Sequence, residues 1–250
     1  MRNRIIVQKY GGTSIGDVEK LKLIAKKISE TKEKGFYPVV VVSAMGKTTD
    51  ELVSMSKEVT FLNKPPDLRE KDILLSTGEL VSSTLLAISI KSLDKKVISL
   101  SGSQAGIITD DIHGSARISD INIARIMTEI KNDNIIIIAG FQGINIDGDI
   151  TTLGRGGSDT TAVALAAALK AEFCEIYTDV EGIFTTDPRI VHNARKLDKI
   201  NYEDMLEMAV LGAKMHPRSI ELASIYNVPV YVAGTFSNKK GTLITKGDEM

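Results

Sequence analysis

The residues of this chain best suited to chemistry lie in the stretch 154–161, Gly-Arg-Gly-Gly-Ser-Asp-Thr-Thr, which runs into the alanine-rich segment 162–169. Its glycines let the backbone lie against a ligand, and Ser158 or Asp159 can cap the helix that follows. A helix N-terminus attracts an anion, and Arg155 adds a planar donor for a carboxylate or phosphate. Arg155 and Asp159 together would suit a zwitterion such as an amino acid. A glycine-rich turn before a capped helix has the same pattern.

A second cation, Lys9, stands where a short β-rich run (5–7) gives way to the glycine turn 10–14. Asp17 then caps a helix predicted over 18–28. Such a turn at the carboxyl end of a parallel strand is where open α/β sheets bind ligands. Phosphate is therefore the expected ligand of Lys9, and the alternative is a surface lysine before a tight turn.

Three further polar residues, Ser43, Thr49 and Glu79, lie after or within apolar segments. Ser43 and Thr49 lie in a small-residue loop after the β-branched run 37–42, where they could donate to a ligand or simply form a turn and a helix cap. Glu79 interrupts the apolar helical region 74–90 beside a glycine and two hydroxyls. It could bind an amine, although an acidic residue in the first turn of a helix is the commoner interpretation.

The elements that must position these side chains alternate between strand and helix. Continuous apolar runs typical of buried parallel strands occur at 37–42 and 135–139. Further strands are predicted at 97–100, 174–178 and 228–232, and Pro229 indicates a sheet edge or a strand start for the last of them. Helical periodicity occurs over 18–28, 74–90, 121–130 (capped by Ser119 or Asp120), 162–169, 202–213 and from Pro217. Strand, glycine loop and helix in repetition predict a doubly wound α/β sheet with its ligand loops along one edge.

Composition excludes several classes of protein. The 250 residues are 43% hydrophobic and 25% charged with net charge −1, so no basic excess indicates nucleic acid binding. The single cysteine, Cys174, excludes an intramolecular disulfide framework and is expected in the core. No signal peptide and no apolar run near 18 residues is apparent, which predicts a cytoplasmic protein without a membrane partner. The three histidines lack metal-ligand spacing, so no protein-held metal is expected.

Four motifs in order carry a resemblance to a known family. Residues 9–14, Lys-Tyr-Gly-Gly-Thr-Ser, resemble the opening Lys-Phe-Gly-Gly-Thr-Ser of aspartokinases, and 153–159 resemble their Leu-Gly-Arg-Gly-Gly-Ser-Asp signature. Segments 177–189 and 212–217 match two further family segments. The resemblance implies the amino acid kinase fold, a three-layer α/β/α sandwich with a mostly parallel central sheet. It also implies one domain over 1–250, with the acceptor bound by about 1–170 and ATP by about 171–250.

The activity that this resemblance implies is phosphorylation of the β-carboxylate of L-aspartate by MgATP, the first step towards lysine, threonine and methionine. The metal would be carried mainly by the nucleotide. Two alternatives stay open at this point. One is another kinase of the same fold, acting on glutamate, N-acetylglutamate, carbamate or UMP, and the other is a non-catalytic nucleotide- or oxyanion-binding protein on that scaffold.

The resemblance also implies site residues, matched position by position. The catalytic group would be Lys9, Asp159, Asp179 and Lys214. Aspartate would be bound by Ser43, Thr49, Glu79, Arg155, Gly157, Ser158 and Asp159. The nucleotide site would contain Lys9, Gly11, Gly12, Ser14, Thr178, Asp179, Phe184, Arg189, Lys214 and Met215.

The chain departs from the family pattern at three places. Tyr10 replaces a phenylalanine, and Phe184 stands where many members carry tyrosine. Aspartokinases usually continue past a segment like 241–244 into paired ACT regulatory domains, whereas this sequence stops at Met250. We therefore expect no ACT domain and no feedback inhibition by lysine or threonine in this chain alone. A homo-oligomer is expected, and a separate regulatory chain is an open alternative.

Overall fold

The computed structural model describes residues 4–187, 190–213 and 215–247. Its centre is an eight-stranded sheet with the order β10-β12-β11-β9-β1-β2-β6-β3. The strands are β1 (Ile5–Tyr10), β2 (Tyr37–Val42), β3 (Val97–Leu100), β6 (Ile135–Ala139), β9 (Phe173–Thr178), β10 (Lys199–Asn201), β11 (Val230–Gly234) and β12 (Thr242–Thr245). Neighbouring strands are parallel except for the antiparallel pair β11–β12. The predicted mostly parallel sheet is therefore confirmed.

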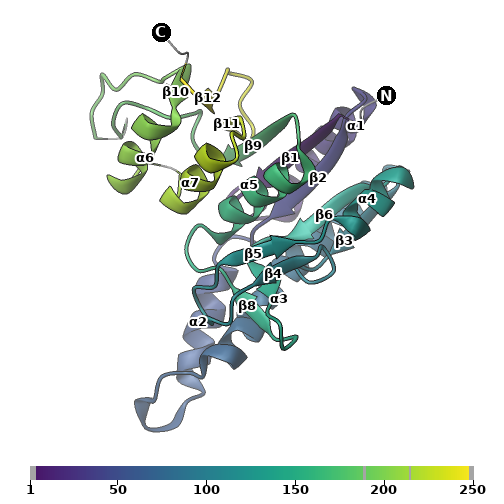
Figure 1. Ribbon diagram of the computed structural model, residues 1–250, viewed down its shortest axis with the longest axis vertical. Helices are drawn as coiled ribbons and strands as arrows, with labels where there is room; N and C mark the ends of the chain where they lie inside the picture. Colours follow the sequence, from purple (N-terminus) through teal and green to yellow (C-terminus); the bar gives the residue numbers. More distant parts are fainter. Residues whose placement is uncertain (1–3, 188–189, 214, 248–250) are drawn as a thin grey trace.

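Helices cover both faces of this sheet because alternate side chains of each strand point to opposite faces. Val40 and Val42 of β2 pack with α1 (Val18–Glu33) and α3 (Leu68–Lys91) in one apolar cluster. Val39 and Val41 belong to the cluster on the other face. That cluster includes α4 (Ala124–Lys131), α5 (Gly157–Leu169), α6 (Tyr202–Val210) and α7 (Pro217–Ile225). The result is the expected three-layer α/β/α sandwich (Figure 1).

A smaller sheet, in the order β5-β4-β7-β8, lies beside the main one. It consists of β4 (Ile107–Thr109), β5 (Ile118–Ile121), β7 (Gln142–Ile144) and β8 (Ile150–Thr152), and sequence periodicity missed its short strands. The helix expected over 121–130 begins later, at Ala124, because Ser119 and Asp120 belong to β5. The predicted caps of that helix are thus wrong, whereas the cap of α1 is confirmed, since the Asp17 carboxylate accepts from the Lys20 amide.

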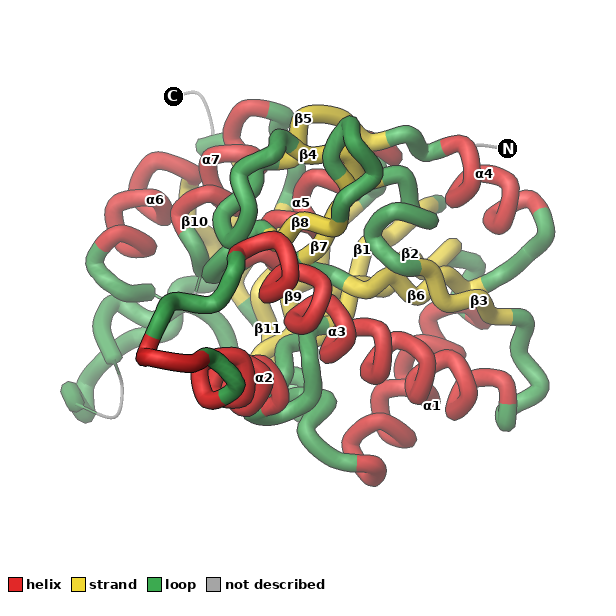
Figure 2. Tube along the Cα trace, turned by 90° about the horizontal axis from the view of Figure 1, so that it is seen from below, coloured by secondary structure: helices red, strands yellow, loops and turns green. Residues whose placement is uncertain are grey.

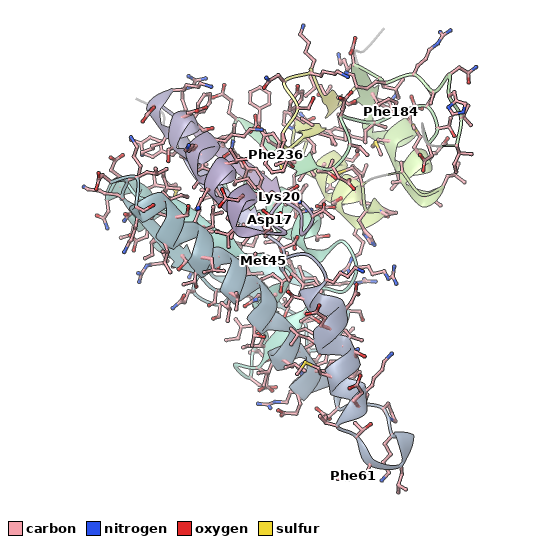
Figure 3. All side chains as sticks on the ribbon, turned by 180° about the vertical axis from the view of Figure 1, so that it is seen from behind. Asp17, Lys20, Met45, Phe61, Phe184 and Phe236 are labelled. Carbon is pink, nitrogen blue, oxygen red and sulfur yellow. The ribbon has the colours of Figure 1, made fainter. Side chains whose placement is uncertain are left out.

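The segment of the chain between β2 and β3 forms an arm that extends from the sandwich. It is built by α2 (Thr48–Glu58), the short 3-10 helix η1 (Phe61–Asn63) and the first half of α3. Phe61 lies at its tip, and α1 and α3 lie side by side on the same face of the molecule (Figure 3). The arm carries α3 past the ends of the strands, where ligand loops are expected.

Helix α3 contains an apolar window of 18 residues, although no apolar run of that length was apparent in the sequence. It is the one helix within the described ranges that is long and hydrophobic enough to span a membrane by length and composition, with a mean hydropathy of 1.7 over that window. Half of its apolar window is buried inside the fold. Core helices of soluble proteins also meet this criterion, so it is weak evidence for a membrane span. The tube view shows α3 beside α1 on one side of the molecule (Figure 2).

Candidate active site

The candidate site lies at the carboxyl end of β1, which has a parallel strand on each side. Strand β1 pairs with β2 on one side and with β9 on the other, and Lys9 lies level with Ile176 of β9. The turn after Lys9 and the Thr178–Asp179 segment after β9 therefore leave the sheet side by side. The gap between two such strands is the ligand-binding position of open α/β sheets.

Lys9 and Asp159 form an ion pair at this position. The Lys9 Nζ lies 2.6 Å from Oδ1 of Asp159, and each side chain is only 12% exposed. Among the described residues, none donates a well-aligned hydrogen bond to this Oδ1, so charge rather than directed bonding holds the pair. An ammonium held in this way can turn towards a competing anion such as a phosphate.

Asp159 owes its position to the start of α5. The helix begins at Gly157, and its N-cap is Gly156 in the left-handed region with φ of 69°, without a side-chain cap. The prediction that Ser158 or Asp159 caps this helix is therefore wrong, because both belong to its first turn. A side chain at Gly156 would also collide with His216, since its Cβ would lie 2.3 Å from the His216 ring and Cβ. This turn needs glycine for both reasons.

The loop before α5 is anchored from both sides while its arginine remains exposed. From α7, Arg218 donates to the carbonyl oxygen of Leu153 at 2.8 Å and to that of Ala116 at 3.0 Å. Arg155 sits between these anchors and α5 with its side chain open to solvent. The backbone that carries Arg155 is thus fixed, and its guanidinium is available for a ligand.

Asp72 anchors the other side of the same loop. This carboxylate is fully buried and accepts from the amides of Gly114 and Thr152, from the Thr152 hydroxyl at 2.5 Å and from the His113 ring at 2.9 Å. Its four partners join α3 to the loop 113–114 and to β8. Because β8 leads directly into Leu153, the start of α3 helps to set the position of Arg155.

Glu79 is a buried carboxylate in the middle of α3. It is 3% exposed, and its Oε1 accepts from the Ala44 amide at 3.0 Å. Burial raises the pKa of Glu79 to about 7, partly offset by the hydrogen bond from Ala44. Its Oε2 is buried without a hydrogen-bond partner among the described residues, so it can still accept from a bound amine.

One cavity of about 690 Å³ collects the predicted acceptor residues. From the expected set it is lined by Lys9, Ser43, Thr49, Glu79, Arg155, Gly157, Ser158 and Asp159. Other lining residues were not expected from the sequence, including Lys71, Asp72, Gly114, Phe141 and Thr152. Lys71 and Asp72 lie in the charged start of α3, just before its apolar part, and that position was the available signal. The cavity therefore offers cations, carboxylates and hydroxyls within a space suited to a small polar molecule.

The residues expected around a nucleotide are more dispersed. Thr178 and Asp179 follow β9, and the Thr178 hydroxyl donates to Oδ1 of Asp179 at 3.0 Å. Phe184 forms an isolated bridge with Lys196 and is half-buried. Met215 is 2% exposed, so its side chain packs in the core rather than facing a ligand. The expected residues Arg189 and Lys214 lie outside the described residues.

The turn after Lys9 also differs in part from expectation. The Gly11 amide donates to the Tyr177 carbonyl oxygen at 3.3 Å, so it is already engaged. The Ser14 hydroxyl is buried against the Thr235 hydroxyl at 2.6 Å and does not line the cavity. Gly12 remains close to the β2 loop, where an added Cβ would lie 2.6 Å from the Ala44 carbonyl oxygen. A phosphate held here would thus depend on Lys9 more than on the Gly11 amide.

The described residues contain no group of three or more His, Cys, Asp or Glu side chains that could hold a metal ion.

A model of the amino acid kinase family matches residues 4–234. This chain belongs to that family.

Within the amino acid kinase family, the chain is similar to aspartokinases. The aspartokinase of Geobacillus stearothermophilus is 55% identical over 241 residues, which cover 96% of this chain and 58% of that protein. Aspartokinase 2 of Bacillus subtilis strain 168 is 53% identical over 247 residues, covering 98% of this chain and 60% of that protein. The resemblance drawn from the motifs is confirmed. The chain spans somewhat less than two thirds of the length of these relatives.

Solved structures of aspartate kinases also superpose on this chain. The aspartate kinase from Synechocystis superposes with a TM-score of 0.86 at 46% identity, covering 98% of this chain and 40% of that one. E. coli aspartokinase III, solved in complex with aspartate and ADP, also has a TM-score of 0.86, at 28% identity over 98% of this chain and 65% of that one. The amino acid kinase fold is therefore confirmed for this chain.

Proposed function

We propose that this chain catalyses the ATP-dependent phosphorylation of the β-carboxylate of L-aspartate to 4-phospho-L-aspartate. The observation that carries the proposal is the convergence of Lys9, Arg155 and Glu79 on one cavity at the carboxyl ends of parallel strands. A cation for a phosphate, a cation for a carboxylate and a carboxylate for an amine match the groups of the two reactants. The similarity to proteins named aspartokinase selects aspartate among the possible acceptors.

The acceptor would be held by its two ends. Arg155 would bind the α-carboxylate through its exposed guanidinium, and Glu79 would accept from the amino group through its unpartnered Oε2. Ser43, Thr49 and Ser158, which line the cavity, would fix the remaining polar atoms. This arrangement leaves the β-carboxylate directed towards Lys9 and the first turn of α5.

The nucleotide would lie over the carboxyl ends of β1 and β9. Thr178 and Asp179 leave β9 beside the Lys9 turn, so they are suited to bind the phosphates and the ribose. Phe184, Arg189, Lys214 and Met215 are proposed to complete this site, as in the family pattern. Mg²⁺ would enter with ATP and neutralise part of the phosphate charge. The residues present fit this role, since Asp159 and Asp179 supply carboxylates without forming a complete protein-held metal site.

The chemical step is a direct phosphoryl transfer. A β-carboxylate oxygen forms a bond to the γ-phosphorus while the bond from phosphorus to the β–γ bridging oxygen breaks, and ADP carries away the electron pair. The attacking carboxylate is already ionised at neutral pH, so no general base is needed. Lys9 would exchange its contact with Asp159 for the transferring phosphoryl group. Catalysis then rests on alignment and on charge neutralisation.

Its biological setting is also part of the proposal. Aspartyl phosphate formation is the first step towards lysine, threonine and methionine, and we place the protein in the cytoplasm as a homo-oligomer. A separate regulatory chain is a further possible partner. The named similarity to aspartokinases supports the pathway assignment.

An acceptor-resolved assay tests the proposed function. Release of ADP from MgATP should depend on aspartate, and hydroxylamine should trap the acyl phosphate as a hydroxamate. Glutamate and N-acetylglutamate in the same hydroxamate assay, and carbamate and UMP in the ADP assay, test the other acceptors. Turnover with one of these in place of aspartate would reassign the substrate. Tight MgATP binding without ADP release from any acceptor would instead favour a binding protein.

A further inference from the structure

A second cavity, of about 660 Å³, lies between α1, strand β9 and the loop after β11. On β9, the fully buried Cys174 and Ile176 pack in the apolar cluster that contains α5, whereas the alternate side chains of the strand line this cavity. It has no lining residue in common with the active-site cavity among the residues that the structure describes. We call it the α1 cavity, and its lining includes Lys27, Phe36, Phe173, Glu175, Tyr177 and Phe236.

Aromatic side chains form much of the wall of the α1 cavity. Phe36, Phe173, Tyr177 and Phe236 are four of the twelve aromatic residues of the chain, whereas the active-site cavity has one, Phe141. Phe236 is 51% exposed and Phe173 is 36% exposed, so both rings have surface left to cover. Figure 3 shows Phe236 beside α1. A ligand with an aromatic ring would therefore find ring partners here.

Lys27 of α1 places an ammonium group in this cavity. Its Nζ lies 3.6 Å from the centroid of the Tyr177 ring and donates to the Thr235 carbonyl oxygen at 3.2 Å. It forms no ion pair with any carboxylate that the structure describes. Burial lowers the pKa of Lys27, and the Glu175 carboxylate opposes this in part. A ligand carboxylate would thus pair with a cation that has lost part of its hydration.

Glu175 of β9 supplies the opposite charge. Its Oε2 accepts from the side-chain amide of Gln8 at 2.8 Å and from the Tyr177 hydroxyl at 2.8 Å. These two bonds hold the carboxylate in place, because Gln8 is itself buried on β1. Its Oε1 accepts no hydrogen bond from the described residues, so it is available for a ligand ammonium group.

We propose that the α1 cavity binds an aromatic α-amino acid. The carboxylate of the ligand would pair with Lys27, its ammonium group would donate to Oε1 of Glu175, and its ring would lie against the phenylalanine side chains. A ligand with only one of the two charges would leave either Lys27 or Glu175 without a partner. The cavity volume is within the range of small-molecule sites. This binding does not depend on the proposed enzymatic activity.

Thr235 joins the α1 cavity to the nucleotide side of the proposed active site. Its carbonyl oxygen accepts from Lys27, while its hydroxyl lies 2.6 Å from the Ser14 hydroxyl and 3.1 Å from the Thr178 carbonyl oxygen. Ser14 belongs to the turn after Lys9, and Thr178 ends β9. A bound carboxylate would compete with Thr235 for the Lys27 ammonium. We therefore expect the amino acid and MgATP to change each other's affinity by the same factor, and this coupling rests on the proposed function.

Calorimetric titration with phenylalanine tests the chemistry of the site. Phenylalanine should bind the unmodified chain in a one-to-one complex. Both 3-phenylpropionate, which lacks the ammonium group, and phenethylamine, which lacks the carboxylate, should bind at least about tenfold more weakly. Leucine, which lacks the ring, should bind severalfold more weakly. Absence of phenylalanine binding would overturn the site, and equal affinities for phenylalanine and leucine would refute its aromatic preference.

Substitutions locate the bound phenylalanine. Lys27→Met should weaken its binding about 10- to 100-fold, whereas the matched control Lys22→Met, on the exposed side of α1, should not. Phe236→Ala should weaken it severalfold, whereas Phe61→Ala, at the exposed tip of the arm, should not. Far-UV circular dichroism would check that each variant is folded. Unchanged binding in both Lys27→Met and Phe236→Ala would overturn the proposal.

Arg155→Ala separates this site from the proposed acceptor site, which also takes an amino acid. Phenylalanine should bind this variant as tightly as the unmodified chain, and aspartate should not displace it. Phenylalanine binding that is lost in Arg155→Ala and kept in Lys27→Met would place the ligand in the active-site cavity and overturn the proposal.

The coupling is measured with a non-hydrolysable ATP analogue and Mg²⁺. Its Kd should change severalfold when phenylalanine is saturating, and the change should vanish in Lys27→Met. An unchanged Kd with phenylalanine bound would refute the coupling and leave the binding site standing. If the analogue did not bind at all, the proposed nucleotide site and the coupling would both fall, while the phenylalanine titrations would still decide the α1 cavity.

Discussion

The Nζ of Lys9 lies 2.6 Å from Oδ1 of Asp159, across the gap between strand β1 and the first turn of helix α5. Each partner would be a poorly solvated charge without the other, since both side chains are largely buried. The pair therefore keeps a cation in place before any substrate arrives. The same cation lies where an incoming phosphate can compete for it.

Replacing Lys9 with methionine should impair turnover more than binding. The substitution keeps most of the side-chain volume but removes the charge proposed to stabilise the transferring phosphoryl group. We expect kcat to fall on the order of 100- to 1,000-fold, with the aspartate KM changed only a few-fold. Steady-state ADP release measures both quantities. Near-normal turnover in Lys9→Met would show that another group neutralises this charge.

Arg155→Ala should produce the opposite kinetic pattern. Because the exposed guanidinium is proposed to bind the α-carboxylate, its loss should raise the aspartate KM about 10- to 100-fold with a smaller change in kcat. The melting temperature should not change, since the side chain is exposed. Arg125→Ala, which removes an exposed arginine on α4, is the matched control. An unchanged KM for Arg155→Ala would reassign the acceptor pocket.

The raised pKa of Glu79 predicts a loss of stability as the pH rises. The folded protein holds this proton up to about pH 7, whereas the unfolded chain releases it near the ordinary glutamate pKa of 4.5. The folded state thus binds more protons between these values, so the free energy of unfolding decreases through this window. Compared with Glu79→Gln, the native chain should lose on the order of 3 kcal/mol from below pH 4.5 to above pH 7. Urea unfolding of both proteins at several pH values would measure this difference, and parallel curves would contradict it.

The same carboxyl group should make aspartate binding depend on pH. An ionised Glu79 attracts the substrate ammonium more strongly than the protonated form, so the aspartate KM should decrease as the pH rises through about 7. In Glu79→Gln this dependence should disappear, and KM should stay near the value that the native protein has below about pH 7. A pH profile of kcat/KM with saturating MgATP provides the measurement. A profile that is identical in both proteins would place the amine elsewhere.

Arg218→Ala should weaken aspartate binding from a distance. Arg218 donates to the carbonyl oxygen of Leu153, two residues before Arg155, and to that of Ala116, whose amide donates to Thr152. Its removal therefore leaves the backbone before Arg155 free to move. We expect a severalfold rise in the aspartate KM, with the ATP KM less affected. Arg218→Lys, which keeps one donor, should recover part of the loss. If melting temperature decreased without a change in the aspartate KM, the role of Arg218 would be stability alone.

The central elements were predictable because their signals are local. The continuous β-branched run of β2 requires burial on both faces, and the structure places it near the middle of the sheet. The short strands β4, β5, β10 and β12 carry no comparable signal, because three or four residues are too few to establish a period. Their pairing depends on partners distant in the sequence.

The site was predictable to the extent that its residues lie in compact motifs. Lys9 lies at the end of strand β1, Arg155 just before α5 and Asp159 in its first turn, so each is next to a local change of structure, and all three line the cavity. Arg218 could not be found in this way, because its role exists only when α7 meets the loop after β8. Glu79 lies in mid-helix rather than in a first turn, because α3 continues through Gly78. Glycine fits there, since a Cβ would lie 2.9 Å from the Ala44 side chain.

Lys9 and Arg155 differ in how far their positions depend on the stability of the whole fold. Lys9 belongs to a strand with a neighbour on each side, so it can be displaced only by opening the most protected part of the sheet. Arg155 belongs to an exposed loop whose side chains take no part in a strand ladder. The proposed phosphate contact of Lys9 is thus tied to global stability, whereas the proposed α-carboxylate contact of Arg155 is not. Substitution of Arg155 would change that one acceptor contact and leave the strand that carries Lys9 intact.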